Sequence, residues 1–111
     1  MIYNQREIIL IPFPYSDLTT AKRRTALIVL NNNYNSKFND VIVCAITSNK
    51  FIDDYSLPLK NENLEYGFMP EESVIKTHKL FTIDKNRILK KFSVIESGYF
   101  KNVIKTLSNL F

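Results

Sequence analysis

Three consecutive cations, Lys22, Arg23 and Arg24, stand just before the apolar run 26–30 of this 111-residue chain. An arginine at the start of a strand has an anchored backbone and can present two parallel N–H donors to one phosphate. In a partly dry site the same donors stabilise charge that develops on phosphorus. The cluster is therefore a candidate phosphate site with Arg24 at its centre. A solvated basic loop is the alternative interpretation.

A second group of polar side chains follows the apolar run 41–46. Thr47, Ser48, Asn49 and Lys50 come there in succession. Hydroxyl and amide groups at a strand end can position a phosphate or a ribose 2′-OH. Serine and asparagine are also frequent in ordinary turns, which is the alternative for this segment.

The only histidine, His78, stands in a third polar group with Lys76, Thr77 and Lys79. Histidine changes its charge near neutral pH, and the neutral imidazole can accept a proton. A lone histidine is also common at structural or surface positions. The sequence contains no His, Cys, Asp and Glu cluster with metal-ligand spacing, so we expect no metal and no cofactor.

Short strands must position these groups. Segments rich in Ile, Val, Phe and Thr predict strands over 7–13, 25–31, 40–47, 55–59, 73–77 and 80–83. The asparagine-rich stretch 31–35 predicts a turn, and Pro12 and Pro14 predict that the first strand ends there or runs along an edge. Asp84 as a helix cap predicts a helix of one or two turns over 84–90, and apolar residues at i, i+3, i+4 spacing predict an amphipathic helix over about 96–110.

This order of elements predicts a mainly β fold with a C-terminal helix, as a small bent barrel or a sandwich. A chain of this length with 45% hydrophobic residues fits one domain over 1–111. Its apolar runs are too short to span a membrane, and no secretory signal is recognisable. The single cysteine, Cys44, lies in an apolar run and is expected to be a buried thiol. We therefore expect a cytoplasmic location.

Positive charge is concentrated in the second half of the sequence. The net charge is +4 overall, and residues 73–111 carry eight Lys and Arg against two acidic residues. Such asymmetry favours an anionic partner on one face of the fold. A lysine-rich solvated surface is the alternative.

The ordered set of segments resembles the MazF/PemK family of toxin endoribonucleases. The residues that carry the resemblance are Ile8–Pro14, Arg24-Thr25-Ala26-Leu27, Ile46-Thr47-Ser48, Gly67-Phe68, Ser73-Val74 and Thr82-Ile83-Asp84-Lys85. They cover nearly the whole chain in family order. The chain departs from the family pattern at Arg6-Glu7, where relatives commonly carry a Gly-acid pair, and at Thr25, where a proline often follows the arginine. The first loop, 16–22, lacks glycines, and the position of His78 often carries an acidic or another polar residue in relatives.

The resemblance implies an SH3-like β-barrel of the MazF/PemK/CcdB type, a homodimer with an RNA groove, and an acidic antitoxin as partner. The implied activity is metal-independent, sequence-selective cleavage of single-stranded RNA to 2′,3′-cyclic phosphate and 5′-OH ends. Arg24 would stabilise the phosphorane, Thr47 would position the phosphate or 2′-OH, and His78 would act as a general base or acid. The expected RNA-binding residues are Lys22, Arg23, Ser48, Asn49, Lys50, Lys76, Thr77 and Lys79.

Two other functions fit the same fold. One is a non-catalytic inhibitor like the CcdB-type gyrase poisons, although these usually bind through a C-terminal helix with a tryptophan, and this chain has none. The other is a nucleic-acid-binding barrel without cleavage activity. Cleavage of RNA alone in vitro separates both from a ribonuclease.

Overall fold

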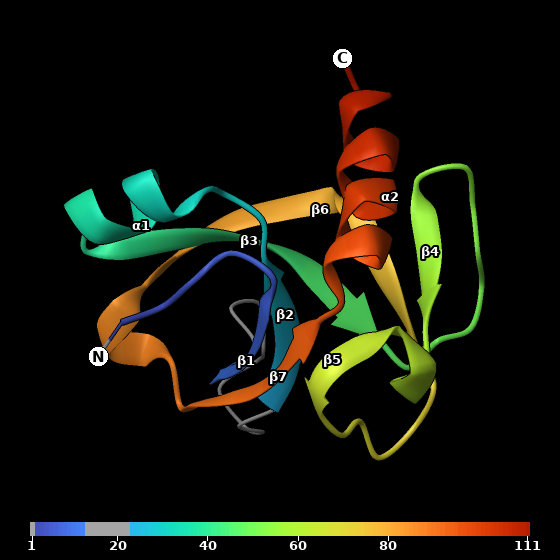
Figure 1. Ribbon diagram of the computed structural model, residues 1–111, viewed down its shortest axis with the longest axis horizontal. Helices are drawn as coiled ribbons and strands as arrows, with labels where there is room; N and C mark the ends of the chain where they lie inside the picture. Colours follow the sequence, from blue (N-terminus) through green and yellow to red (C-terminus); the bar gives the residue numbers. More distant parts are fainter. Residues whose placement is uncertain (1, 13–22) are drawn as a thin grey trace.

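A computed structural model describes residues 2–12 and 23–111. Within these residues, seven antiparallel strands form one curled sheet in the order β4-β6-β3-β2-β1-β7-β5 (Figure 1). The strands are β1 Glu7–Pro12, β2 Arg23–Ile28, β3 Asp40–Thr47, β4 Ser56–Leu59, β5 Leu64–Gly67, β6 Ser73–Asp84 and β7 Lys90–Ile95. The helices are α1 Asn32–Lys37 and α2 Ser97–Ser108, with 3₁₀ turns η1 Asn61–Asn63 and η2 Lys85–Arg87.

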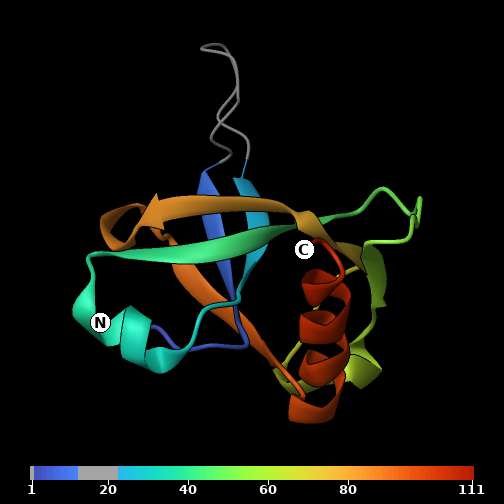
Figure 2. The ribbon, with the colours of Figure 1, turned by 90° about the horizontal axis from the view of Figure 1, so that it is seen from above.

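The predicted mainly β barrel-like fold with a C-terminal helix is confirmed. Alternation along β1, β2 and β3 sends side chains to both faces of the sheet, and both faces are buried. Ile8, Leu27 and Cys44 lie in the cluster that also contains Phe100 and Val103 of α2. Ile9, Ile28 and Val43 lie in a second cluster on the other face. The curl of the sheet therefore encloses one face, and α2 covers the other (Figures 1 and 2).

Cys44 is fully buried, as expected, and burial raises the pKa of its thiol to about 12. The terminal helix is also confirmed. The Glu96 carboxylate accepts hydrogen bonds from the backbone N–H groups of Gly98 and Tyr99, both at 2.9 Å, which caps α2 and lowers the pKa of Glu96. No helix within residues 2–12 and 23–111 is long and apolar enough to cross a membrane.

Three predicted elements differ from the structure. The turn predicted over 31–35 is wrong, because Asn31 caps α1 by accepting a hydrogen bond from the Tyr34 N–H at 2.9 Å. The two strands predicted over 73–77 and 80–83 are parts of the single strand β6. The helix predicted over 84–90 is the short turn η2, capped by Asp84, after which the chain enters β7.

Two strands, β5 and β7, were not predicted. β7 begins with Lys90 and Lys91, and only Phe92, Val94 and Ile95 are apolar, so its sequence lacks a strong strand periodicity. It forms because β1 pairs with it on one side and β5 on the other. β5 ends at Gly67, where φ is +91° and an added Cβ would lie 2.6 Å from Ser93 Cβ. Glycine is required there both for the backbone conformation and for the approach to β7.

Candidate RNA-binding site

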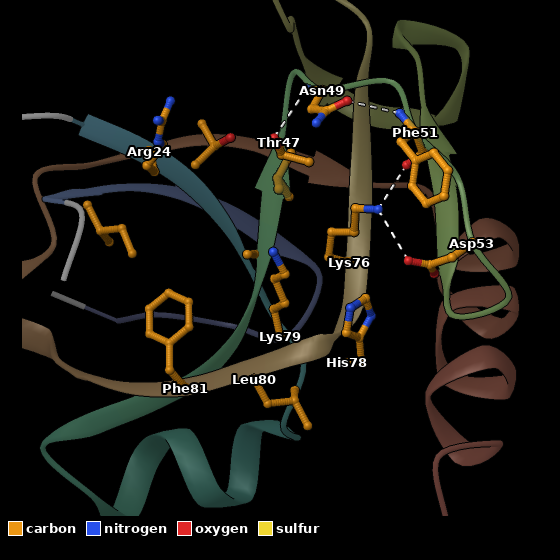
Figure 3. A pocket seen from close by; sticks show the side chains of 14 residues that line it. Arg24, Thr47, Asn49, Phe51, Asp53, Lys76, His78, Lys79, Leu80 and Phe81 are labelled. Atoms are coloured by element: carbon orange, nitrogen blue, oxygen red, sulfur yellow. Dashed lines mark hydrogen bonds and ion pairs between the residues drawn. The ribbon is translucent and has the colours of Figure 1, made fainter. Parts of the chain in front are cut away.

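A pocket of about 720 Å³ opens where β2 begins and β3 ends (Figure 3). Its floor continues the sheet face that carries Ile9 and Val43, and its walls come from β6 and from the segment between β3 and β4. The lining residues are Ile11, Arg24, Thr25, Ala45, Ile46, Thr47, Asn49, Phe51, Asp53, Lys76, His78, Lys79, Leu80 and Phe81.

The register of β2 and β3 brings Arg24 and Thr47 together. Ala26 pairs with Ala45 in the antiparallel ladder. Arg24 lies two residues before Ala26, and Thr47 lies two residues after Ala45, so both are at the same end of the strand pair and on the same face as these alanines. Arg24 also pairs with Ile11 of β1, which fixes its backbone from the other side. Both side chains line the pocket, so the first and second polar groups of the sequence meet at one site.

A three-residue irregularity in β6 brings the third polar group to the same pocket. Cys44 pairs with Leu80, but the next residue, Ala45, pairs with Lys76 instead of Lys79. Thr77, His78 and Lys79 therefore lie outside the ladder. His78 and Lys79 are exposed and line the pocket, and the His78 ring makes an edge contact with Tyr55 at 6.2 Å between centroids.

Thr77 points the other way. It is fully buried, and its hydroxyl and backbone N–H both donate to the Tyr55 carbonyl, at 2.7 and 3.1 Å. The expectation that Thr77 contacts RNA is inconsistent with this burial, because a side chain with no exposed surface cannot meet a ligand. Its hydrogen bonds instead attach the irregular part of β6 to the residue before β4.

Lys76 is buried rather than solvated, with 7% of its surface exposed. Its Nζ donates to the Phe51 carbonyl at 2.8 Å and to Asp53 Oδ2 at 3.4 Å. Asp53 also accepts from the Ser56 hydroxyl at 2.7 Å and from the Tyr55 N–H at 2.9 Å. These bonds, with the Ser56 hydroxyl contributing most, and the nearby Lys76 charge lower the pKa of Asp53 to about 2. Lys76 therefore holds residues 51–53 of the pocket wall in place through these two contacts.

The other expected RNA-binding residues occupy three kinds of position. Asn49 lines the pocket, and its side-chain oxygen accepts from the Phe51 N–H at 3.2 Å. Arg23 and Ser48 line a smaller neighbouring hollow of about 220 Å³ that shares Arg24, Thr25 and Ile46 with the pocket. Lys50 is exposed and lines neither hollow as described. Lys22 lies outside the described residues.

Sequence reasoning missed Phe51 and Asp53, which both line the pocket. The available signals were an aromatic residue directly after the polar group 47–50 and an Asp three residues before Ser56. Neither pattern indicates a pocket residue by itself, because the sequence does not show that Lys76 contacts residues 51–53. In residues 2–12 and 23–111, no three His, Cys, Asp or Glu side chains are grouped so that they could hold a metal ion.

The family model of PemK-like, MazF-like toxins of type II toxin–antitoxin systems matches residues 4–111. The chain belongs to this toxin family. The resemblance seen in the sequence motifs is thereby confirmed. A search of the curated proteins finds no match.

Solved structures of an endoribonuclease and of MazF toxins share the fold of this chain. An endoribonuclease from Mycobacterial species, in complex with its cognate antitoxin, is 13% identical with a TM-score of 0.79, over 96% of this chain and 92% of that one. The Mycobacterium tuberculosis toxin MazF-mt6 is 16% identical with a TM-score of 0.76, over 94% of each chain. The MazE-MazF complex from Deinococcus radiodurans is 15% identical with a TM-score of 0.79, over 99% of this chain and 96% of that one.

Proposed function

We propose that this toxin is a metal-independent endoribonuclease that cleaves single-stranded RNA, including mRNA, at selected sequences. The observation that carries the proposal is the convergence of Arg24, Thr47 and His78 on one pocket from three different strands. A guanidinium, a hydroxyl and an imidazole are the groups that transesterification at phosphorus needs when side chains do the chemistry.

The proposed reaction is attack of a ribose 2′-OH on the adjacent phosphorus. The 2′-oxygen forms a bond to phosphorus, the bond from phosphorus to the 5′-oxygen breaks, and a 2′,3′-cyclic phosphate and a 5′-OH remain. The 2′-OH must lose a proton and the leaving 5′-oxygen must gain one. His78 would accept or donate a proton in these steps, while Arg24 would stabilise the charge on the phosphorane oxygens. Thr47 would hold the phosphate or the 2′-OH in line.

Exposed cations beside the reacting groups support RNA as the substrate. Lys79 and Arg24 are exposed in the pocket, and Arg23 is exposed in the neighbouring hollow. The two hollows share Arg24, so a strand that crosses from one to the other would place a phosphate beside this residue. Structural relatives described as an endoribonuclease and as MazF toxins have the same fold.

The two neighbouring hollows, together called the groove, carry exposed cations that an antitoxin with an acidic segment could cover, and we propose such an antitoxin as a partner. We propose a second copy of the chain as the other partner, in a homodimer. One structural relative is an endoribonuclease in complex with its cognate antitoxin, and another is a MazE-MazF complex. We propose that the toxin acts in the cytoplasm, where mRNA is available.

Incubation of the purified protein with a defined RNA pool, followed by sequencing of the cut ends, tests this function. We expect cleavage in excess chelator, cyclic phosphate and 5′-OH ends, and no cleavage where the 2′-OH is replaced by hydrogen. Loss of activity in chelator would contradict the metal-free mechanism. Salt-sensitive RNA binding without any cyclic phosphate would instead indicate a non-catalytic binding protein or an inhibitor.

A further inference from the structure

Phe51 holds an exposed aromatic ring at the pocket wall. Phe51 is 68% exposed and lines the pocket together with His78 and Phe81. The residue follows β3 in a segment without regular secondary structure. The exposed ring shares the pocket with the exposed cations Arg24 and Lys79, and the proposed chemistry does not use it.

Specific hydrogen bonds hold the backbone of this segment (Figure 3). The Phe51 carbonyl accepts from Lys76 Nζ at 2.8 Å, and the Phe51 N–H donates to the Asn49 side chain at 3.2 Å. Asp53, which pairs with Lys76, fixes the chain two residues later through Ser56 and Tyr55. The Lys76 ammonium also lies 5.3 Å from the centroid of the Phe51 ring, within cation–π range. The ring is thus presented from an ordered position.

Single-stranded nucleic acid is bound by this combination of features. Cations follow the phosphates, and aromatic rings stack on the bases. Phe51 supplies a ring, and Arg24 and Lys79 supply exposed charge in the same pocket. A preorganised ring loses little conformational entropy when a base stacks on it.

We propose that Phe51 is the platform on which one base of the RNA stacks, with Lys76 and Asp53 as positioning residues that hold it beside Arg24 and Thr47. The inference rests on the proposed ribonuclease function and adds a base-binding subsite to it. Stacking on Phe51 would unstack that base from its neighbour and fix the strand relative to the reacting phosphate. The contact accepts any base, so base preference at this position would come from the surrounding pocket wall.

Binding of 2′-O-methylated single-stranded RNA by Phe51→Leu tests the proposal. The variant is expected to fold, because Phe51 is 68% exposed and the hydrogen bond from Lys76 to the Phe51 carbonyl is kept, so only the cation–π contact is lost. Affinity should fall roughly fivefold to a hundredfold, the range for loss of one stacked base. Phe51→Tyr should retain binding. The matched control is Phe38→Leu, since Phe38 is 50% exposed and lies before the opposite end of β3.

The salt dependence of binding separates stacking from charge. Phe51→Leu should leave the slope of log affinity against log salt unchanged, whereas Lys79→Ala should reduce its magnitude by roughly 0.7. A scan with single abasic positions then locates the stacked base. One abasic position should weaken binding to the unsubstituted protein and have no further effect on Phe51→Leu.

An identical abasic scan for the unsubstituted protein and Phe51→Leu would overturn the stacking proposal, even if both cleave RNA normally. In that case the ribonuclease function would stand without this subsite. If the unsubstituted protein neither binds nor cleaves RNA, the proposed function itself fails. Loss of antitoxin binding in Phe51→Leu with unchanged RNA binding would assign the ring to a protein contact and would also overturn the proposal.

Discussion

Arg24 on β2 and Thr47 on β3 each lie two residues from the pair Ala26–Ala45, at the same end of the two strands, and both line the pocket. The pairing of Ala26 with Ala45 sets this relationship, because a shift of one residue would send one of the two side chains to the face that α2 covers. The strand register therefore controls the candidate chemistry. A phosphate between these two side chains could accept hydrogen bonds from both.

The Arg24→Ala variant tests the role of this guanidinium in the transition state. We expect cleavage to fall by roughly a hundredfold or more, the scale for loss of one preorganised donor. Binding of an uncleavable RNA should weaken much less. Arg24→Lys should restore activity only in part, because an ammonium cannot form the planar two-donor contact. Equal losses of binding and cleavage in single-turnover assays would reduce Arg24 to a binding cation.

His78 is the candidate for proton transfer. If its imidazole accepts the 2′-OH proton, the cleavage rate should rise with pH over the range in which histidine side chains become neutral. His78→Ala should lower the rate and remove this rise. The measurement is a single-turnover pH–rate profile for both proteins. An unchanged profile in a folded variant would contradict proton transfer by His78 and would leave this residue its edge contact with Tyr55.

The strands in the centre of the sheet were predictable because their sequences are apolar on both faces. β1, β2 and β3 are buried on both sides and therefore contain short runs of Ile, Val and Leu. β7 forms by pairing with β1 and β5, which are distant in the sequence, and β5 forms by pairing with β7, so no local sequence pattern predicts either strand. Asn31 is ambiguous for a similar reason, since asparagine favours both turns and helix caps.

The candidate site was predictable in its parts and not in its connections. Arg24, Thr47 and His78 could be selected from residue type and position, and the structure places all three at one pocket. The irregular pairing after Cys44 could not be predicted, although the break expected between 77 and 80 falls at the same place. That pairing buries Thr77 and exposes His78 and Lys79. The ion pair of Lys76 with Asp53 depends on the same long-range contact.

The hydrogen bonds that Asp53 accepts from Ser56 and Tyr55, together with its ion pair with Lys76, predict a pH dependence of stability. The pKa of Asp53 is lowered to about 2 from an ordinary value of 3.8, so its carboxylate stabilises the folded state above about pH 4. This contribution should disappear as the pH falls from about 4 to about 2. Asp53→Asn should therefore be less stable than the unsubstituted protein at pH 6 and should approach it near pH 2. Urea unfolding at several pH values measures the difference, and a difference that does not change with pH would contradict the assignment.

Arg6 has a left-handed backbone with φ of +79°, at the position where relatives of this family commonly carry glycine. Its side chain compensates by donating to the Ile95 carbonyl at 2.9 Å, and it also pairs with Glu65 at 3.3 Å. Arg6→Ala loses these bonds and keeps the unfavourable backbone, whereas Arg6→Gly loses the bonds and relieves it. We expect the glycine variant to be more stable than the alanine variant by about 1–2 kcal/mol. Thermal or urea unfolding of the pair measures this directly, and equal stabilities would contradict the backbone explanation.

An antitoxin is expected to regulate this toxin by covering the groove formed by the two hollows. Arg23, Arg24 and Lys79 are exposed around the two hollows, so an acidic segment of the antitoxin should occupy the place of the RNA phosphates. If this segment is disordered when free, its ordering on binding has a free-energy cost. Its association should be faster at low salt, because charge steers the encounter.

Competition between RNA and the acidic segment distinguishes occlusion of the groove from inhibition elsewhere. A saturating peptide with the acidic sequence should abolish binding of 2′-O-methylated RNA, and RNA should weaken peptide binding by the same factor. Lys79→Ala should weaken both ligands, whereas Phe51→Leu should weaken RNA more than the peptide if the ring serves a base. Simultaneous binding of RNA and peptide without mutual weakening would mean that the antitoxin acts at another surface, and the groove would then be reserved for RNA.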